Sequence, residues 1–553
     1  MPDRPRVDLV CNEPSPAAQA LALLVAELGA SVSLVTPTAV RPDRQRTAAI
    51  VLDGVDPDVL AALGHAPTLV VAADEKAVRS IAHGSGIAVG LGQRIRCRDY
   101  DFAPNEPVLW PFAGLSVQEE ADRELETLLG PAVHPLVTVV GRPVLAAIRG
   151  SDMLVTTAVP WPDAAPPYLL RSAMSPRRFL DVLPTLIFVR RALGERAWRR
   201  PRAQAIAVID DPNLARLSYG YLDYQQAARL ASDCRFHLSI GFVPLDYSRT
   251  DPAVGRFFLE NERRLSLVMH GNDHLKREMA RAVSDDRASF AMRQGLARMR
   301  RHRELTGLAC APIMTMPHGA SDPRWVKAMR DAGYSAAMIG RAYSFTDDPQ
   351  SAGAGRLYEL MPAETSLYGF PLVTRWALEY PLTDVLFGAF LGKPSCVYTH
   401  HQFFAEGWGP FLNAVSFLNR QLDSRWGPAV EIVQSNYLFR RRGGTLMVRA
   451  FSNDLLIEVP DWANHVEVEK LGARIPYETE RVLVEGHAVE ESERSETRIA
   501  ASVVPHKPGS LGVQFVSTLA GDPGPGWERV MLTSRARRWI TETRDRRASV
   551  LFS

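Results

Sequence analysis

The sequence predicts an α/β protein of several domains, and three observations support this class. A chain of 553 residues is too long for one hydrophobic core. Strand-like and helix-like patterns alternate over residues 7–160 and again from Ala203 to about Asp423. From about Val433 onward, strand-like runs predominate. We therefore expect two α/β domains followed by a small β domain.

The first domain, residues 1–165, is expected to be of the Rossmann or flavodoxin type. The run VDLVC predicts a strand, and PAAQALALLVAELG predicts a helix that stops at Gly29. Three more strand-like runs alternate with short helical patterns, which predicts a parallel sheet with helices on its faces. The stretch GSGIAVGLG, Gly84 to Gly92, follows a helix rather than a strand, which favours a scaffold or docking domain over nucleotide binding.

A Pro-rich stretch, Val159 to Tyr168, predicts the boundary with the second domain. The pattern FLDVLPTLIFVRRALGERAW then predicts an amphipathic helix that leads into an α/β domain over residues 170–428. Residues 433–553 make up the expected β-rich accessory domain. Its basic end (SRARRW, RDRR) predicts a tail or a packed helix rather than a nucleic-acid arm.

The composition narrows the class of partner and the compartment. Apolar residues make up 46%, charged residues 23%, and the formal net charge is +2, so neither nucleic acid nor an anionic membrane is expected as main partner. Five scattered cysteines without a CxxC pair favour a reducing compartment. No run approaches the ~18 apolar residues of a membrane span, and the N-terminus lacks a signal-peptide pattern. We expect a cytoplasmic protein without a membrane span.

The run AQAIAVI predicts a buried strand that ends on two adjacent acids, Asp210 and Asp211, before Pro212. A second strand-like run, LSLVM, ends on VMHGNDH, which holds His270 and His274. Side chains four residues apart share one face of a helical turn and can reach a single ion. The alternatives are a turn with solvated acids at the first strand end and an ordinary helix start at the second.

One aspartate and two histidines form a facial metal set with open positions for water and substrate. Because the carboxyl ends of strands in a barrel or open α/β sheet build the active site, the two motifs can converge. We expect one acid to bind a divalent metal and its neighbour to act as general base.

Two further strand ends fit the same site. MTMPHGASDP, Met314 to Pro323, ends in a turn whose backbone N–H groups could face an oxyanion, and His318 is either in this pocket or on the surface. SCVYTHHQFF predicts a strand that ends on histidines. His400 is preferred as general acid because strand alternation puts it on the face of Tyr398, and His401 is the second choice.

The order of these four elements resembles the polysaccharide deacetylase family, carbohydrate esterase family four, over about residues 200–425. The matching residues are Ile209-Asp210-Asp211-Pro212, His270 to His274, Met316-Pro317-His318-Gly319 and Tyr398-Thr399-His400. The resemblance implies a distorted (β/α) barrel and a divalent metal, usually zinc. It implies that Asp210 is the base, that Asp211, His270 and His274 bind the metal, and that His400 is the acid.

The chain departs from the family pattern in the third and fourth motifs. The family's third motif supplies an arginine two residues before its proline, which orients the base, and this chain has Thr315 there. Arg375 or Arg341 could replace it from elsewhere. Pro212 stands where the family has glycine, and Trp376 is the candidate for the fourth motif.

The resemblance implies a metal-dependent deacetylase that removes acetyl or similar acyl groups from an N-acetylated sugar or polysaccharide. Two alternatives remain: a glycan-binding or assembly protein that has lost turnover, and an amidohydrolase acting on a small non-sugar amide. Five aromatic residues near the strand ends suit either sugar stacking or the core: Tyr219, Tyr221, Phe403, Phe404 and Trp408.

Overall fold

The computed structural model describes most of the chain, namely residues 4–53, 55–158, 179–275, 277–319, 321–340, 361–365, 367–471, 480–495, 498–505, 509–517 and 532–551. The chain divides into two compact units, which are residues 1–199 with 355–360 and 440–442, and residues 200–354 with 361–439 and 443–553. The expected boundary at Val159–Tyr168 lies outside the described residues. The assignment of three domains stays a prediction.

The first unit contains a nine-stranded sheet in the order β2-β1-β3-β4-β9-β8-β7-β5-β6. Its strands are β1 (Arg6–Val10), β2 (Ser31–Val35), β3 (Arg46–Val51), β4 (Thr68–Val70), β5 (Gly90–Phe102), β6 (Ser116–Leu129), β7 (Val133–Val139), β8 (Arg142–Ile148) and β9 (Met153–Thr156). Its helices are α1 (Pro16–Glu27), α2 (Pro57–Leu63), α3 (Glu75–Ser85) and α5 (Phe179–Leu193).

The expected parallel α/β pattern holds only for the first part of this sheet. Strands β1 to β4 and β9 pair in parallel, whereas β5 to β8 pair antiparallel. Helix α1 starts after Ser15, whose side chain accepts from the Ala18 N–H, and Gly29 follows its end with a φ of 110°. The alternation predicted up to residue 160 is therefore wrong beyond α3, because long antiparallel strands follow one another without helices.

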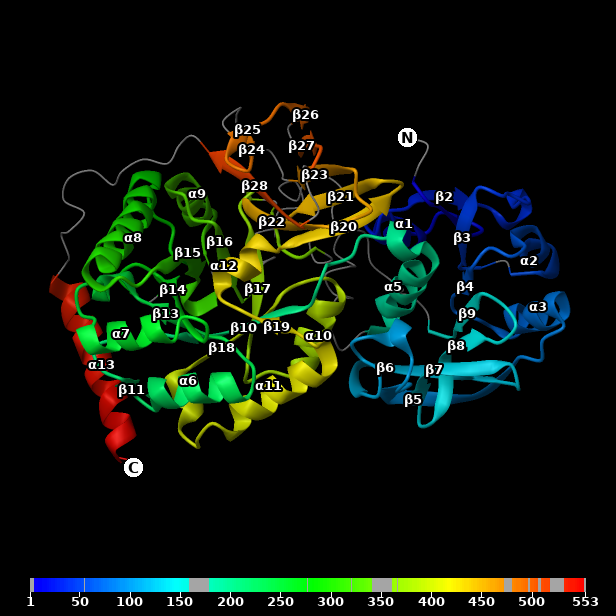
Figure 1. The fold of residues 1–553 in the computed structure, drawn as a ribbon. Coiled ribbons are helices and arrows are strands. Elements are labelled where there is room, and N and C mark those ends of the chain that lie inside the picture. The colour runs from blue at the N-terminus through cyan, green and yellow to red at the C-terminus, as the bar shows by residue number, and fades with distance from the viewer. Residues whose placement is uncertain are drawn as a thin grey trace. The chain divides into compact units, whose positions relative to one another are not determined.

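A closed barrel of seven parallel strands forms the centre of the second unit (Figure 1). Neighbouring strands pair in parallel around the ring, and β10 closes it by pairing with both β13 and β18. The barrel strands are β10 (Gln204–Asp210), β13 (Leu238–Phe242), β14 (Leu265–His270), β15 (Cys310–Thr315), β16 (Ala336–Ile339), β17 (Leu372–Ala377) and β18 (Ser395–His400). This ring matches the (β/α) barrel expected from the sequence.

Helices surround the barrel strands, as Figure 1 shows. They are α6 (Tyr224–Asp233), α7 (Pro252–Glu260), α8 (Asp285–Thr306), α9 (Pro323–Ala332), α10 (Leu382–Phe390), α11 (Gly409–Leu422) and α12 (Ala429–Gln434). Three short strands, β11 (Ser218–Tyr219), β12 (Leu222–Asp223) and β19 (Arg425–Trp426), complete this part of the unit. Because all seven barrel strands run in the same direction, their carboxyl ends meet at one rim.

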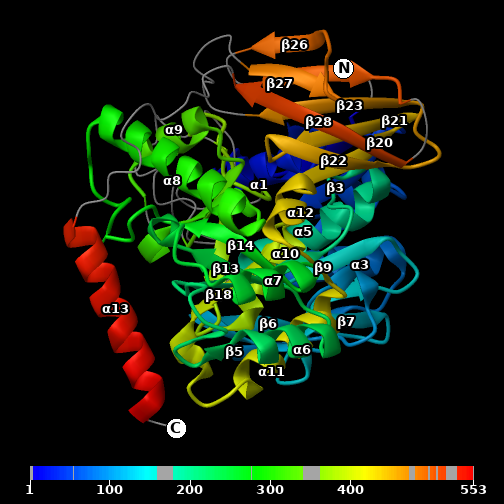
Figure 2. The ribbon, with the colours of Figure 1, turned by 60° about the vertical axis from the view of Figure 1, so that its left-hand side comes forward.

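Two further sheets are formed by strands that follow the barrel in the chain (Figure 2). The first has the order β20-β21-β23-β27-β26 and the second β22-β28-β24-β25. The strands are β20 (Tyr437–Arg442), β21 (Thr445–Ala450), β22 (Asp454–Val459), β23 (His465–Leu471), β24 (Glu480–Val484), β25 (His487–Ala488), β26 (Glu491–Ser495), β27 (Arg498–Val503) and β28 (Gly509–Ser517). Apolar side chains from both sheets share one core, including Val448, Ile457 and Val513.

The basic C-terminal region forms helix α13 (Leu532–Leu551), which runs alongside barrel elements in both views (Figures 1 and 2). Ser534, Arg538, Glu542 and Asp545 of this helix are buried. The sequence predicted either a tail or a packed helix for this region, and the structure has the packed helix. None of the helices in the described residues is long and apolar enough to cross a membrane.

Candidate metal centre

Two barrel strands end on the residues that the sequence singles out. Asp210 is the last residue of β10 and His270 the last of β14, and the intervening strand β13 places Gly241 beside Asp210. A Cβ atom on Gly241 would lie 2.7 Å from Asp210 Oδ1 and 3.4 Å from the His270 Cβ. Glycine at this point therefore lets the two side chains approach each other across β13.

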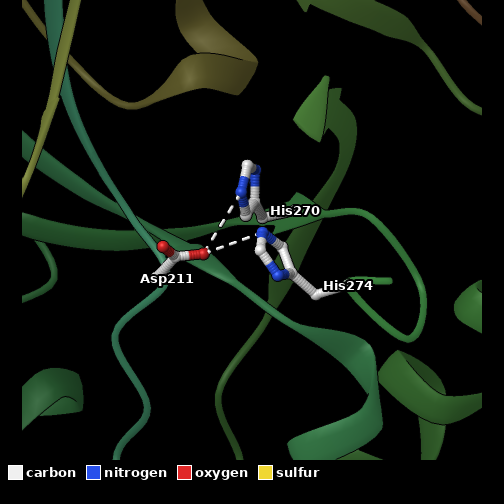
Figure 3. Close-up of side chains that lie close together, drawn as sticks. All are labelled: Asp211, His270 and His274. Carbon is white, nitrogen blue, oxygen red and sulfur yellow. Dashed lines mark ion pairs between the residues drawn. The ribbon is translucent and has the colours of Figure 1, made fainter. Parts of the chain in front are cut away.

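The side chains of Asp211, His270 and His274 point toward one another at the rim of the barrel (Figure 3). Asp211 Oδ1 lies 3.0 Å from His274 Nε2 and 3.4 Å from His270 Nε2. One ligand atom from each residue lies within 4.8 Å of the other two. Across the described residues, no other group of three or more histidine, cysteine or acidic side chains is arranged in this way.

The tautomer of His270 is determined by Thr315. His270 Nδ1 lies 3.0 Å from the Thr315 carbonyl oxygen, which can only accept, so Nδ1 carries the proton and donates. In the neutral ring, Nε2 then has a lone pair directed at the Asp211 carboxylate. Thr315 Oγ1 is 2.9 Å from the same Nδ1, and its one proton has two acceptors within reach, the Met269 carbonyl at 3.1 Å and Asp210 Oδ1 at 3.3 Å.

This arrangement fits a divalent cation. A carboxylate oxygen and the Nε2 lone pair of a neutral His270 repel each other unless a proton or a cation lies between them. Two imidazole nitrogens and one carboxylate oxygen are ligands that zinc and similar metals accept, and a second shell such as Thr315 is typical of such sites. The chemistry of the donor set therefore matches the group that the sequence predicts.

His274 reaches the site from a loop, not from a helix. The helical turn expected for the two histidines is wrong, because His270 ends a strand and Gly271 and His274 both have a positive φ, 65° and 53°. The Glu278 carboxylate accepts the backbone N–H groups of Asn272, Asp273 and His274 at 3.1, 3.0 and 2.9 Å. Three backbone donors on one half-buried carboxylate hold the loop in the shape that returns His274 to His270.

The second acid, Asp210, is held by an arginine on β17, which is separated from β10 by the single strand β18. Arg375 Nη1 on β17 lies 2.6 Å from Asp210 Oδ2, and Arg375 Nη2 donates to the Met316 carbonyl at 2.8 Å. The guanidinium also lies 3.9 Å from the centre of the Tyr398 ring. Asp210 and Arg375 are 1% and 2% exposed, so this pair is shielded from water. Of the two arginines that could replace the one missing from the third motif, Arg375 lies next to the acid. The other, Arg341, lies outside the described residues.

The two neighbouring acids are both kept ionised by their surroundings. Burial would raise the pKa of Asp210, but the positive charge of Arg375 lowers it below its usual value. Burial would also raise the pKa of Asp211, but when a proton rather than a metal lies between Asp211 and the rings of His270 and His274, the resulting hydrogen bonds and positive charge hold that pKa well below its usual value. The site therefore presents one carboxylate to the histidines and one to an arginine.

The two candidate histidines after β18 lie in different environments. His400 is the parallel register partner of Asp210 and is exposed, and its ring lies 6.4 Å from that of Tyr398, in keeping with strand alternation. His401 is 1% exposed and packs against Tyr219, with the ring centroids 5.3 Å apart. Its Nε2 lies 3.5 Å from Asp545 of α13. Solvent and substrate can therefore reach His400 but not His401.

The loop proposed as an oxyanion site offers few donors. Pro317 has no N–H, and the Gly319 N–H already donates to the Met316 carbonyl at 3.1 Å. The expectation that backbone N–H groups of this turn face an oxyanion therefore has no support from Pro317 or Gly319 and stays a prediction. His318 in this loop is exposed, and its ring lies 6.2 Å from the His274 ring, at the edge of the site.

Most of the aromatic candidates belong to the core. Tyr219, Phe404 and Trp408 are 0%, 3% and 7% exposed, so they cannot stack on a sugar in this conformation. Trp376 packs over Gly388 of α10, where an added Cβ would meet its ring at 2.5 Å. Alternation along β17 thus directs Arg375 inward and Trp376 outward, which gives Trp376 a packing role.

The sequence did not indicate a role for Glu278. Thr315 was noted only because it stands where the family has an arginine. Glu278 lies outside the four motifs, and Thr315 departs from the pattern of its motif; Glu278 acts through backbone groups and Thr315 through a histidine nitrogen. An acid four residues after a Gly-Asn-Asp-His turn is a signal that could have identified Glu278 as an acceptor for the N–H groups of that turn.

Comparisons with known proteins are limited to weak structural likenesses. No family model and no curated protein matches the chain. Solved structures with partial likeness include several family 4 carbohydrate esterases and deacetylases. A family 4 carbohydrate esterase from Streptomyces lividans is 10% identical with a TM-score of 0.25, and covers 40% of this chain and 89% of its own.

Two further structures illustrate how mixed these likenesses are. A putative polysaccharide deacetylase from Mycobacterium smegmatis is 13% identical, with a TM-score of 0.25 and coverage of 42% of this chain and 95% of its own. A putative GMP synthase protein from Thermoplasma acidophilum is 14% identical, with a TM-score of 0.23 and coverage of 34% and 94%. TM-scores this low do not establish a shared fold, so the function must be argued from the site.

Proposed function

We propose that this protein is a metal-dependent hydrolase that removes an acetyl or similar acyl group from an N-acetylated sugar or glycan. The observation that supports the proposal most directly is that two adjacent acids, Asp210 and Asp211, have different partners. Asp211 faces the Nε2 atoms of His270 and His274, whereas Asp210 pairs with Arg375 and lies 3.6 Å from the other ring nitrogen of His270, Nδ1. A metal-dependent hydrolase in which a side chain takes the proton of water needs both a metal ligand set and a separate base close to it.

Asp211, His270 and His274 would hold the divalent ion, most simply zinc. When bound, such an ion polarises the acyl carbonyl and lowers the pKa of water. Thr315 keeps the His270 Nε2 available as a ligand by accepting a hydrogen bond from Nδ1. Glu278 keeps His274 within reach by fixing the loop backbone.

Asp210 is proposed as the general base. It takes a proton from the water that attacks the acyl carbon, while Arg375 and Thr315 orient its two carboxylate oxygens. The pair with Arg375 keeps Asp210 ionised before the reaction. Arg375 also donates to the Met316 carbonyl, and this contact fixes the guanidinium. The fixed guanidinium can then hold the carboxyl group of Asp210 in place after it has taken the proton.

His400 is proposed as the general acid. It follows Tyr398 on β18, is open to solvent, and lies opposite Asp210 in the register of β10 and β18. As imidazolium it gives a proton to the departing nitrogen, so that the C–N bond breaks to leave an amine and acetate. His401 is unsuited to this step because it is covered by Tyr219 and Asp545.

The proposal is tested with metal analysis and an acetate-release assay on N-acetylglucosamine oligomers. We expect the purified full-length protein to bind one zinc ion per chain and to release acetate. Asp211→Asn should lose metal and activity together. Asp210→Asn should keep the metal and lose turnover by about 10²–10⁴-fold, the usual contribution of a general base.

Asp233→Asn, at the exposed end of α6, is the matched control and should behave as wild type. If the wild-type protein binds no divalent ion, the proposed function is wrong. Metal binding without acetate release from any N-acetylated sugar would instead favour a glycan-binding protein or an amidohydrolase for a small non-sugar amide.

A further inference from the structure

Helix α13 packs with its polar side inward. The buried positions are Ser534, Arg538, Glu542 and Asp545, whereas Trp539 and Ile540 on the other side are 63% and 62% exposed. A surface helix normally buries its apolar side chains and leaves charged ones in water. The attachment of α13 therefore depends on specific hydrogen bonds and ion pairs rather than on apolar burial.

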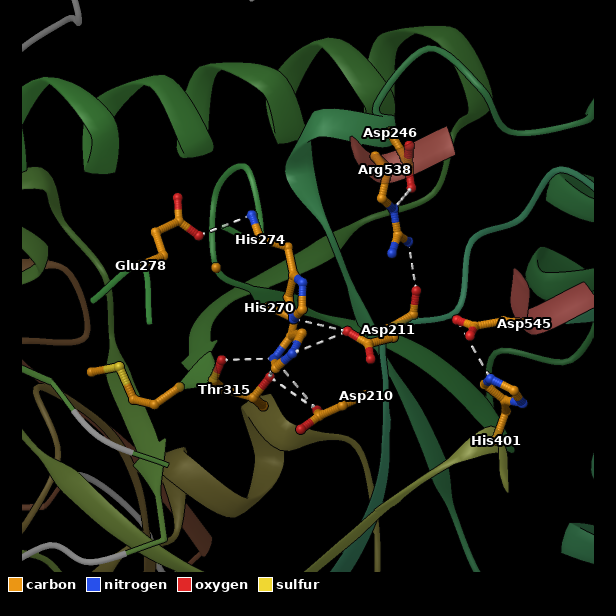
Figure 4. A network of polar contacts seen from close by, with 12 residues as sticks. Asp210, Asp211, Asp246, His270, His274, Glu278, Thr315, His401, Arg538 and Asp545 are labelled. Carbon is orange, nitrogen blue, oxygen red and sulfur yellow. Dashed lines mark hydrogen bonds and ion pairs between the residues drawn. The ribbon is translucent and has the colours of Figure 1, made fainter. Parts of the chain in front are cut away.

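These polar contacts reach the loops that follow the metal-site strands. Arg538 Nε lies 2.8 Å from Asp246 Oδ2, in the loop after β13, and Arg538 Nη2 donates to the Asp211 carbonyl at 2.6 Å (Figure 4). Ser534 Oγ lies 3.1 Å from Asp273 Oδ2, in the loop after β14. One helix, contributed by the end of the chain, thus connects three loops at the rim of the barrel.

The contact with Asp211 bears directly on its conformation. Asp211 has a φ of 84°, in the left-handed region that a residue with a side chain rarely adopts. Its own N–H donates to the Gly241 carbonyl at 3.2 Å, and its carbonyl accepts from Arg538. Both backbone groups of Asp211 are therefore held, and this fixes the direction in which the carboxylate leaves the chain.

Arg538 is itself held firmly in place. It is 4% exposed, and Asp246, its carboxylate partner, is 1% exposed and also accepts from Arg249 Nη1 at 2.9 Å. Arg249 in turn reaches Glu542 of α13 at 2.6 Å. The guanidinium thus has a buried charged partner on one side and the Asp211 carbonyl on the other, which leaves it little freedom to move.

We propose that Arg538 is a positioning residue for the metal centre: it holds Asp211 in the left-handed conformation that directs its carboxylate at His270 and His274. This inference rests on the proposed function, because it assumes that these three residues bind the ion. It makes α13 a working part of the centre although Arg538 and Asp211 are 327 residues apart in the chain.

The inference is tested on the full-length chain by measuring zinc affinity with a competing chromophoric chelator. Arg538→Met should weaken zinc binding by about 10- to 100-fold, as the loss of partners behind metal ligands usually does. Arg538→Lys keeps one donor group and should recover part of the loss. Arg535→Met, at an exposed position of the same helix, is the control and should bind zinc as wild type does.

Thermal unfolding of the metal-free proteins separates positioning from general stability. A positioning role predicts that Arg538→Lys retains nearly the unfolding midpoint of the wild type while its zinc affinity is lower. Wild-type zinc affinity in a folded Arg538→Met or Arg538→Lys protein would overturn the inference, yet leave the proposed function intact. If the wild-type protein binds no zinc, the proposed function itself fails. If Arg538→Met does not fold, the comparison of Arg538→Lys with Arg535→Met decides.

Discussion

At the scale of single residues, the buried pair of Asp210 and Arg375 is the most consequential feature of the site. Two charges removed from water are tolerated only because each is matched in position and hydrogen-bonded on both sides. Removing one member leaves the other charged and unpaired. Removal of either charge should therefore lower the stability of the protein, and removal of Arg375 should also raise the pKa of Asp210.

Arg375→Met is predicted to destabilise the protein by about 3–5 kcal/mol, the cost of breaking a buried ion pair on one side. Turnover should fall by at least about 10²-fold because Asp210 loses its orientation and its charge partner, while zinc content remains unchanged. Urea unfolding, metal analysis and acetate release measure the three effects. Arg256→Met, on the exposed side of α7, is the control. Full activity of Arg375→Met would contradict the assigned role.

A second prediction at this scale concerns pH and a histidine remote from the site. Burial lowers the pKa of His237 from its ordinary value of 6.5 to about 4, and its Nε2 lies 2.9 Å from Ser266 Oγ. Between these two pKa values the unfolded chain binds the proton and the folded protein does not. The stabilisation is thus complete above pH 6.5 and is lost as the pH falls toward about 4.

His237→Asn should remove this part of the pH dependence. In the wild type, this histidine should lower the free energy of unfolding by about 3 kcal/mol as the pH falls from 6.5 to about 4, since one pKa unit corresponds to about 1.4 kcal/mol. Urea midpoints at both limits give the comparison, with the exposed His465→Asn as control. An unchanged pH dependence in His237→Asn would show that folding does not lower the pKa of His237.

At the scale of elements, the loop after β14 determines whether the second histidine can take part. The spacing of four residues between His270 and His274 suggested one face of a helix, but a loop brings the side chains together instead. This works because Glu278 accepts three N–H groups that would otherwise be unpaired. The same local sequence without that acid has no evident reason to fold back.

Glu278→Gln is predicted to lower zinc affinity by about 10-fold. The glutamine amide has only one acceptor oxygen, so the donors on the other side lose their partner and the loop around His274 loosens. The exposed Glu260→Gln, at the end of α7, is the matched control. Zinc affinity equal to wild type in a folded Glu278→Gln protein would show that the loop keeps its shape without the carboxylate.

At the scale of the whole molecule, closure of the barrel brings the site together. Asp210 and His270 lie on strands separated by β13, and they meet only because the ring of parallel strands places their carboxyl ends at one rim. Gly241 on β13 is the point at which this closure is tightest. A side chain there would have to push Asp210 aside.

Gly241→Ala is therefore predicted to lower stability by about 1–3 kcal/mol, as overpacking does. Turnover should fall by about 10²-fold, because a shift of about 1 Å in a catalytic group has that effect. Gly255→Ala on α7 is the control, since its Cβ would meet nothing nearer than 3.7 Å. Acetate release at the wild-type rate from Gly241→Ala would show that Asp210 can shift without loss.

Much of the fold and the donor set could be predicted from local pattern. Apolar runs that end on polar side chains identified β10, β14 and β18, and the spacing of acids and histidines identified the ligand types. The antiparallel strands β5 to β8 could not be anticipated in the same way, because an apolar run does not show the direction of its neighbour. The loop geometry of His274 was missed for a similar reason, since sequence spacing does not distinguish a helical turn from a loop held by a distant carboxylate.

The sequence by itself determined which residues could bind a cation and that they follow barrel strands, because side-chain chemistry and strand periodicity are local properties. Only the tertiary structure decided which partners serve them: Arg375 for Asp210, Thr315 for His270 and Arg538 for Asp211. These pairs are separated by 165, 45 and 327 residues. Their selection depends on strand register and barrel closure, which no short stretch of sequence encodes.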